Sequence, residues 1–129
     1  MSDTDKKWNL VGYARVSTDD QNLDLQLNAL RNAGVPEKQI MREHMSGVKR
    51  NRPQLDHALR ILREGDVLVV WKLDRLGRSL KDLVELAEHL EANKIQLRSL
   101  TEGVDTTTAL GKFFYHIMAA LAQFERDLI

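Results

Sequence analysis

The sequence lacks several features that would point to particular classes of protein. It contains no cysteine, which excludes disulfide bonds and thiolate chemistry. No apolar run approaches the roughly 18 residues that a membrane-spanning helix needs. The polar start "MSDTDKKWN" also lacks the apolar core of a signal peptide. These absences predict a soluble protein of the cytoplasm with no membrane partner.

An excess of charge of one sign is also missing, since the formal net charge is zero. Proteins that bind duplex DNA usually carry a basic footprint, so this balance counts mildly against DNA as a partner. Arginines nevertheless outnumber lysines by eleven to eight, and six basic residues lie close together: Arg42, Lys49, Arg50, Arg52, Arg60 and Arg63. Because arginine binds phosphate bidentately, this cluster is either a solvated surface or a binding site.

The hydrophobic pattern alternates between strand and helix. A chain of 129 residues with 43% hydrophobic composition fits one globular domain. The predicted strands cover residues 10–16, 39–44, 66–72 and 95–100. The predicted helices follow "STDD", begin at Pro53, span residues 80–93, and run from about Asp105 to the end. This βαβαβαβα order predicts an α/β fold with a mostly parallel four-stranded sheet flanked by helices.

Reactive side chains follow the first three predicted strands. Ser17 follows the first, residues 46–52 follow the second, and the "LDRLGR" turn at 73–78 follows the third. Ligands of such sheets bind beyond the carboxyl ends of the strands. If the first and third strands are neighbours, we expect one rim that carries a hydroxyl group and several guanidiniums.

Ser17 itself has two interpretations. Ser17 and Thr18 each stand three residues before a side chain suited to a capping box, Asp20 and Gln21 respectively, so either could simply begin a helix. Arg15, however, lies two residues before Ser17, and the amino terminus of a helix favours an anion. Ser17 is therefore either a cap or a nucleophile.

Elimination narrows the chemistry that Ser17 could perform. Acyl transfer needs a histidine base, but of His44, His57, His89 and His116 only His44 falls near the rim, and the G-x-S-x-G motif is missing. Metal-ligand spacings and a phosphate-binding P-loop are also missing. Phosphoryl transfer to the serine remains, because guanidiniums can balance the charge of a pentacoordinate phosphorus without a metal.

Several motifs occur in an order that is specific to one family. They are "GYARVSTDDQ", Gln26, the Ser46–Gly47 pair, Arg52, "KLDRLGRS" at 72–79, and "ALAQFERDLI" at 120–129. Over residues 10–129 the chain closely resembles the small serine recombinases, the family of resolvases and DNA invertases. That resemblance implies a site-specific recombinase in which Ser17 attacks a DNA phosphodiester to form a 5′-phosphoserine link, without metal, ATP or other cofactor.

The resemblance also implies roles by position. Four arginines match those that hold the scissile phosphate: Arg15, Arg52, Arg75 and Arg78. Asp74 matches an acid that orients this cluster. Five residues match supporting positions: Tyr13, Gln21, Gln26, Glu125 and Arg126. Glu43 stands where the family more often has aspartate, so it receives no role.

The same resemblance implies partners and a domain arrangement. We expect residues 1–8 to be a flexible extension and residues 9–129 to be a catalytic domain that ends at the start of a long dimerisation helix. The family's helix-turn-helix domain is absent, which would account for the neutral charge and predicts weak DNA affinity and poor activity. We expect DNA, a homodimer and a synaptic homotetramer, and possible help from an accessory DNA-bending protein.

Two further expectations follow. The protein should be encoded by a bacterium, a phage or a mobile element, and it should be associated with the nucleoid. An apolar face around Phe113, Ile117, Met118 and Phe124 should be exposed in the monomer. The alternative to the recombinase is a non-catalytic α/β module that oligomerises or binds phosphate, in which Ser17 is only a cap.

Overall fold

The strands form one five-stranded sheet in the order β2-β1-β3-β4-β5. The computed structural model describes residues 9–17, 23–45, 52–77 and 79–128, so the predicted extension at 1–8 lies outside it. The strands are β1 (Leu10–Ser17), β2 (Ile40–Met45), β3 (Val67–Val70), β4 (Gln96–Ser99) and β5 (Val104–Asp105). The α-helices are α1 (Leu23–Asn32), α2 (Pro53–Ile61), α3 (Leu80–Ala92) and α4 (Ala109–Asp127). Two short 3-10 helices, η2 (Glu37–Gln39) and η3 (Leu73–Arg75), precede β2 and α3.

The pairing of the strands confirms the predicted α/β fold with a mostly parallel sheet, although the sheet has five strands and not four. β1 pairs in parallel with both β2 and β3, and β3 pairs in parallel with β4, whereas β5 is antiparallel to β4. The first and third strands are therefore neighbours, with Tyr13 opposite Val70. This was the condition for a single rim at the carboxyl ends of β1, β2 and β3.

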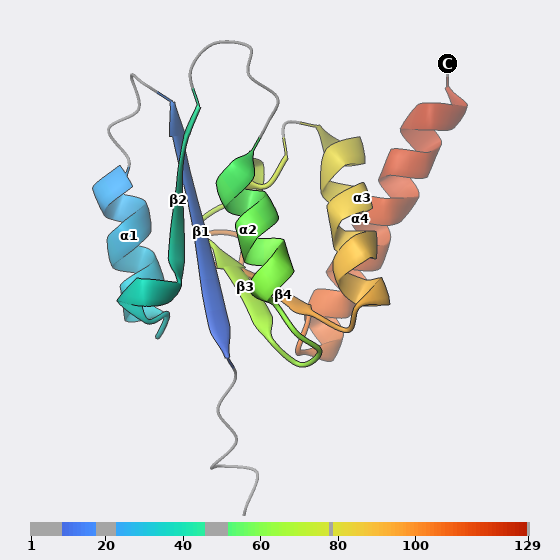
Figure 1. Cartoon of the computed structure of the whole chain (residues 1–129). Coiled ribbons are helices and arrows are strands. Elements are labelled where there is room, and N and C mark those ends of the chain that lie inside the picture. Colours follow the sequence, from blue (N-terminus) through green and yellow to red (C-terminus); the bar gives the residue numbers. More distant parts are fainter. Residues whose placement is uncertain (1–8, 18–22, 46–51, 78, 129) are drawn as a thin grey trace, which may run out of the picture.

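Helices cover both faces of the sheet (Figure 1). α1 packs on one face, where Leu27 and Leu30 meet Val67 and Val69 in a buried cluster. α2 and α3 cover the other face, and α4 lies beyond α3. All four residues of β3 are fully buried, as expected of a central parallel strand covered on both sides.

The end of the chain differs from the prediction. The last helix begins at Ala109 and not near Asp105, because Val104 and Asp105 form β5 against β4. The hydroxyl of Thr108 then accepts the backbone N–H of Gly111 at 3.0 Å, which is the bond of a helix N-cap. A competing strand pairing and this cap together delay the helix by four residues. Within the described ranges, no helix is long and apolar enough to cross a membrane.

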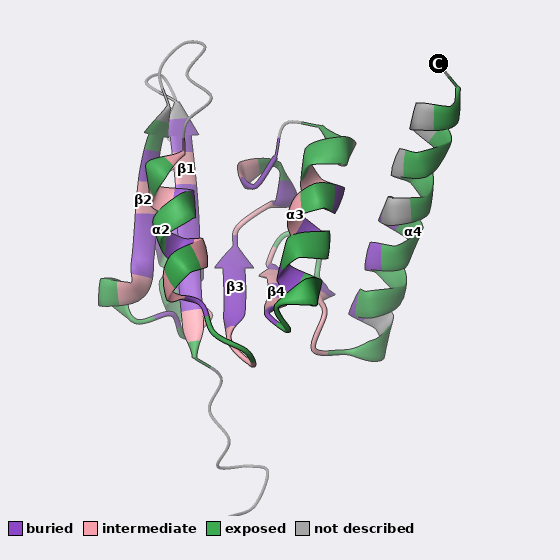
Figure 2. Ribbon diagram, turned by 45° about the vertical axis from the view of Figure 1, so that its right-hand side comes forward, coloured by how far each residue is buried: buried purple, intermediate pink, exposed green. Residues whose placement is uncertain are grey.

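Much of α4 is exposed to solvent (Figure 2), and its exposed residues include large apolar ones. The exposed fraction is 61% for Phe113, 43% for Ile117 and 60% for Phe124. Met118 was expected on this face, but that expectation is wrong, because Met118 is only 9% exposed and belongs to the core. Met118 follows Tyr115 by three residues on the helix, so both turn toward the core rather than outward.

Candidate functional site at the carboxyl ends of the strands

β1 carries the first residues of the site. Tyr13 and Arg15 alternate along the strand and so lie on the same face of the sheet. Ser17 is the last residue of β1 and lies opposite Met45 of β2, and the structure describes Ser17 through its backbone alone. The strand therefore ends at Ser17 on the rim that the sequence predicted.

The buried amide of Gln26 holds the backbone of Arg15. Its Oε1 accepts the N–H of Arg15 and its Nε2 donates to the carbonyl of Arg15, both at 3.1 Å. The pairing of β1 with β3 ends at Tyr13, two residues earlier, so a side chain from α1 takes over as the backbone partner at Arg15. Gln26 thereby fixes the path of the strand just before Ser17.

Two arginine side chains from other elements bind the turn formed by η3. Arg15 donates through Nη2 to the carbonyl oxygen of Asp74, and Arg52 donates through Nη1 to the carbonyl oxygen of Leu76. Arg52 immediately precedes α2, so β1 and α2 both reach the same turn. A carbonyl oxygen orients a guanidinium and leaves its positive charge in place.

Arg75 adds a third guanidinium to this turn. Its Nε lies 3.5 Å from Oδ1 of Asp74, and its side chain is 16% exposed against 67% for Asp74. Its guanidinium carbon also lies 5.4 Å from the centroid of the Trp71 ring, on which Lys72 Nζ approaches to 4.8 Å. An ion pair and a cation–π contact thus orient Arg75 from two sides.

Glu43, to which the sequence assigned no role, is a buried link between β1 and α2. Its Oε1 accepts the Tyr13 hydroxyl at 3.3 Å, the N–H of Gln54 at 3.1 Å and the N–H of Leu55 at 3.3 Å. A carboxylate at the start of a helix is favourable because it binds free N–H groups there. Glu43 therefore anchors the end of α2 that bears Arg52. The N–H groups of a helix starting at Pro53 were the one available hint, since they needed an acceptor.

The pKa of the Tyr13 phenol depends on its burial and on the charged side chains around it. Burial raises the pKa of the Tyr13 phenol well above its ordinary value of 10.0, and the negative charge of Glu43 raises it further. The positive charges of Arg52 and Arg15 act in the opposite direction. The phenol is consequently a hydrogen-bond donor to Glu43 throughout the physiological range of pH.

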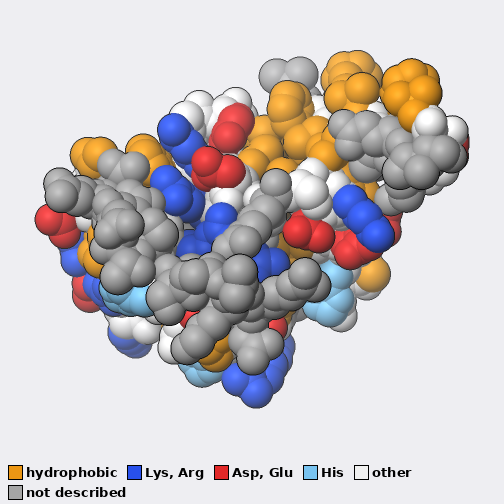
Figure 3. All heavy atoms as spheres, turned by 90° about the horizontal axis from the view of Figure 1, so that it is seen from above, with side chains coloured by type: hydrophobic (Ala, Val, Ile, Leu, Met, Phe, Trp, Pro, Cys, Tyr) orange, Lys and Arg blue, Asp and Glu red, His pale blue; other side chains and the backbone are white. Residues whose placement is uncertain are grey.

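The structure brings together only part of the predicted set. Arg15, Arg52, Asp74 and Arg75 meet at the η3 turn. Gln21 and Arg78 lie outside the described residues. Glu125 and Arg126 belong to α4, which is described there through its backbone and lies beyond α3 (Figure 1). Seen from the rim, Lys and Arg side chains gather near the centre of the face, whereas apolar side chains follow α4 (Figure 3).

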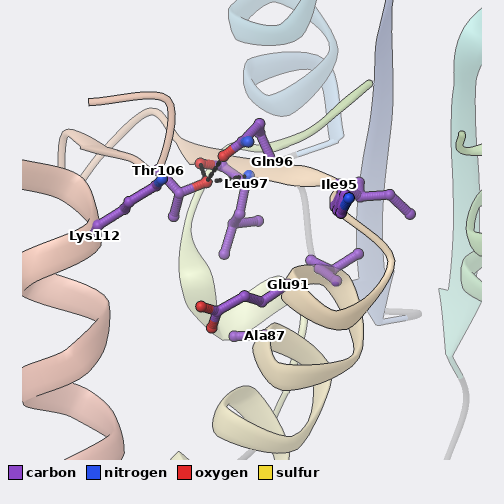
Figure 4. A pocket seen from close by; sticks show the side chains of 9 residues that line it. Ala87, Glu91, Ile95, Gln96, Leu97, Thr106 and Lys112 are labelled. Carbon is purple, nitrogen blue, oxygen red and sulfur yellow. Dashed lines mark hydrogen bonds between the residues drawn. The ribbon is translucent and has the colours of Figure 1, made fainter. Parts of the chain in front are cut away.

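A pocket of about 280 Å³ lies at the opposite end of the sheet, between α3, β4 and the start of α4 (Figure 4). Its lining includes Glu91, Lys94 and Lys112. The hydroxyl of Thr106 accepts the N–H of Leu97 at 2.7 Å, so polar groups at the pocket join β4 to the segment before α4. This pocket contains none of the predicted site residues.

Comparisons with known proteins identify the family of this chain. A family model for "Resolvase, N terminal domain" matches residues 10–129. The chain belongs to the resolvase family. This resolvase-family chain is 54% identical over 120 residues to "Serine recombinase gin" of Escherichia phage Mu, a match that covers 93% of the chain and 61% of that protein. It is also 48% identical over 120 residues to "Transposon Tn917 resolvase" of Enterococcus faecalis, covering 93% of the chain and 64% of that protein.

A solved structure supports the same assignment. The N-terminal catalytic domain of TP901-1 integrase superposes with a TM-score of 0.75 at 31% identity, covering 92% of this chain and 97% of that one. The resemblance read from the sequence motifs is confirmed. The resolvase-family domain nevertheless spans only 61% and 64% of the two relatives named above.

Proposed function

We propose that this resolvase-family domain is the catalytic part of a site-specific DNA recombinase, with Ser17 as its nucleophile. One observation carries the proposal: Arg15, Arg52 and Arg75 converge on the η3 turn, next to the strand that ends at Ser17. Positive side chains oriented by main-chain carbonyls suit an anion that gains charge as it reacts. A phosphodiester is such an anion.

In the proposed reaction the Ser17 oxygen attacks the phosphorus atom and loses its proton. The bond from phosphorus to the 3′ oxygen breaks, and that oxygen gains a proton and leaves as a hydroxyl group. The phosphate stays on the 5′ end as an ester of Ser17. Attack by a 3′-hydroxyl reverses the step, so rejoining needs no ATP, and the guanidiniums supply the charge that a metal would otherwise provide. Asp74 orients Arg75, and Arg78 and the supporting residues Gln21, Glu125 and Arg126 complete the proposed set.

The proposed partners follow from the same family assignment. We propose that DNA is the substrate, that copies of the chain form a homodimer and a synaptic homotetramer through α4, and that an accessory DNA-bending protein can assist. The relatives named above come from a phage and a bacterium and include both a recombinase and a resolvase. We therefore propose that a catalytic domain of this kind can belong either to a DNA invertase or to a resolvase.

Trapping the covalent intermediate tests the proposal. With a nicked or mismatched DNA substrate, we expect a protein–DNA adduct that survives denaturation and EDTA and disappears in Ser17→Ala. The same variant should be compared with wild type by urea unfolding, since loss of a helix cap costs about 1 kcal/mol. If adduct formation persists in Ser17→Ala while stability falls by that amount, Ser17 is a cap and the proposal fails.

Two other outcomes would identify rival functions. Retained DNA or phosphate binding, without any adduct even in a chain extended by a DNA-binding domain, would indicate a non-catalytic module. Cleavage that EDTA abolishes, leaving free 5′-phosphate ends, would indicate a metal-dependent nuclease.

A further inference from the structure

Glu102 lies in the loop that joins β4 to β5, a hairpin that the hydrophobic pattern of the sequence does not indicate. The antiparallel pairing of Ser99 with Val104 closes this loop at the carboxyl end of β4, and therefore at the same rim as the η3 turn. Gly103, with φ of 71°, takes the left-handed conformation that turns the chain back into β5. The loop thus places an acidic side chain beside the turn on which the arginines converge.

Both carboxylate oxygens of Glu102 contact the first residue of that turn. The N–H of Leu73 lies 3.3 Å from Oε1 and 3.3 Å from Oε2. Ser99, which is fully buried in β4, donates its hydroxyl to Oε1 of the same carboxylate. Glu102 is therefore held from the core by Ser99 and in turn holds the start of η3.

The contact continues the strand pairing where the backbone can no longer do so. Leu100 donates its N–H to the carbonyl of Val70 at 3.0 Å, and Thr101 donates to the carbonyl of Trp71 at 2.8 Å. Beyond Trp71 the chain bends into the turn, and the Glu102 carboxylate supplies the next acceptor. The remainder of the turn is fixed by packing, since Leu73 is 6% exposed and Leu76 is 1% exposed.

We propose that Glu102 is a positioning residue for the arginine site, and that it sets the rate of the chemical step by fixing the η3 turn. The turn carries Arg75 and offers the Asp74 and Leu76 carbonyls to Arg15 and Arg52, so its displacement moves all three guanidiniums relative to Ser17. Glu102 acts through main-chain contacts and touches no reacting atom. The proposal rests on the proposed function of Ser17.

A set of matched variants separates positioning from charge. Glu102→Gln keeps an acceptor oxygen at the same reach, whereas Glu102→Ala removes it. Glu85→Ala, at an exposed acid of α3, removes the same charge away from the turn. At saturating DNA, we expect Glu102→Ala to slow adduct formation by about ten- to a hundredfold, as for the loss of a charged hydrogen bond. Glu102→Gln should recover most of the wild-type rate, and Glu85→Ala should match wild type.

The affinity for DNA distinguishes positioning from general damage. The half-saturating DNA concentration should stay within about twofold of wild type in Glu102→Ala, because the lost interaction matters in the transition state. A wild-type rate in Glu102→Ala, or an equal loss in Glu102→Gln, would overturn the proposal. If Glu102→Ala fails to fold, Ser99→Ala takes its place and should slow the rate in the same direction.

A second measurement keeps the two proposals distinguishable. Hydrogen exchange of the Arg75 and Leu76 amides, which bond to the Lys72 and Leu73 carbonyls at 3.1 and 3.0 Å, reports the turn directly. Faster exchange at these amides in Glu102→Ala, with unchanged exchange in β3, is the expected result. If the wild-type chain forms no adduct even when it is extended by a DNA-binding domain, the function of Ser17 is refuted, while this exchange still decides whether Glu102 fixes the turn. Unchanged exchange refutes the role of Glu102.

Discussion

Gln26 and Glu43 both bind main-chain groups, the first at Arg15 and the second at the start of α2. Both are buried, so each must find partners inside the protein for its own polar atoms. Each thereby places an arginine-bearing segment of the site: β1 with Arg15, and α2 with Arg52 at its edge. Residues of this kind are as important to the geometry as the arginines themselves.

The ionisation of the two tyrosines tests whether their side chains are buried. Burial raises the pKa of Tyr115 to about 12, with the carboxylates of Glu91 and Glu88 adding to the shift, and it raises the pKa of Tyr13 further. In the unfolded chain both phenols ionise near 10.0. We therefore expect the ultraviolet absorbance of tyrosinate to stay low at pH 10 in the native protein.

The stability has a matching pH dependence. Because the folded pKa values are raised, the unfolded state releases protons first as the pH rises. The contribution of both phenols is present in full below pH 10.0; that of Tyr115 is lost as the pH rises through about 12, and that of Tyr13 is lost at a still higher pH. Tyr115→Phe should remove the titration near 12 and leave that of Tyr13. Tyrosinate absorbance near pH 10 in a chain with a native circular dichroism spectrum would contradict this account.

At the scale of elements, the contact between α4 and β5 depends on Gly111. A Cβ atom at this position would lie 1.9 Å from the carbonyl oxygen of Asp105, a backbone atom that cannot rotate away. The helix can therefore approach the strand this closely only with glycine.

Gly111→Ala should separate α4 from β5. Alanine has the higher helix propensity, by about 1 kcal/mol, yet we expect a net loss of roughly 2 kcal/mol or more in the free energy of unfolding because the overlap cannot be relieved locally. Urea denaturation would measure it. Ala120→Gly, at an exposed position of the same helix, is the control and should cost about 1 kcal/mol from propensity alone. A Gly111→Ala protein as stable as wild type would show that α4 is not packed as described.

At the scale of the whole molecule, α4 presents an apolar face to solvent. Phe113 and Phe124 are 61% and 60% exposed, and Leu121 between them is 51% exposed. Single exposed apolar side chains are common on protein surfaces, but a continuous row along one helix is typical of an interface. The proposed oligomer would bury this row.

We expect the chain to self-associate through this face in a concentration-dependent manner. Phe124→Ser should weaken association by about tenfold or more, since burial of one phenylalanine contributes roughly 1.5–3 kcal/mol. Sedimentation velocity would measure the change. Gln123→Ser alters the adjacent polar side of α4 and should leave association unchanged. Equal association of wild type and Phe124→Ser would place the interface elsewhere.

Apart from β5, the order of strands and helices, the parallel pairing within the sheet and the rim at Ser17 could be predicted from the sequence. The hydrophobic pattern of β3 and the periodicity of the helices are local properties, and the handedness of crossovers limits how such elements can be joined. The motifs around Arg15, Arg52 and Asp74 could also be recognised in the sequence, because each lies within a few residues of the end of a strand or helix. The family followed from those motifs in order.

Other features were decided only by the tertiary structure. β5 is only two residues long and forms because β4 is available to pair with it. A strand this short has no hydrophobic periodicity from which it could be predicted. Glu43 and Glu102 are ordinary acids in the sequence, and each acquires its contacts from a segment 11 or 29 residues away. The orientation of Met118 toward the core depends on where α3 lies. Local pattern determined which elements form, whereas the acceptors and donors that fix the arginines come from segments brought together only by folding.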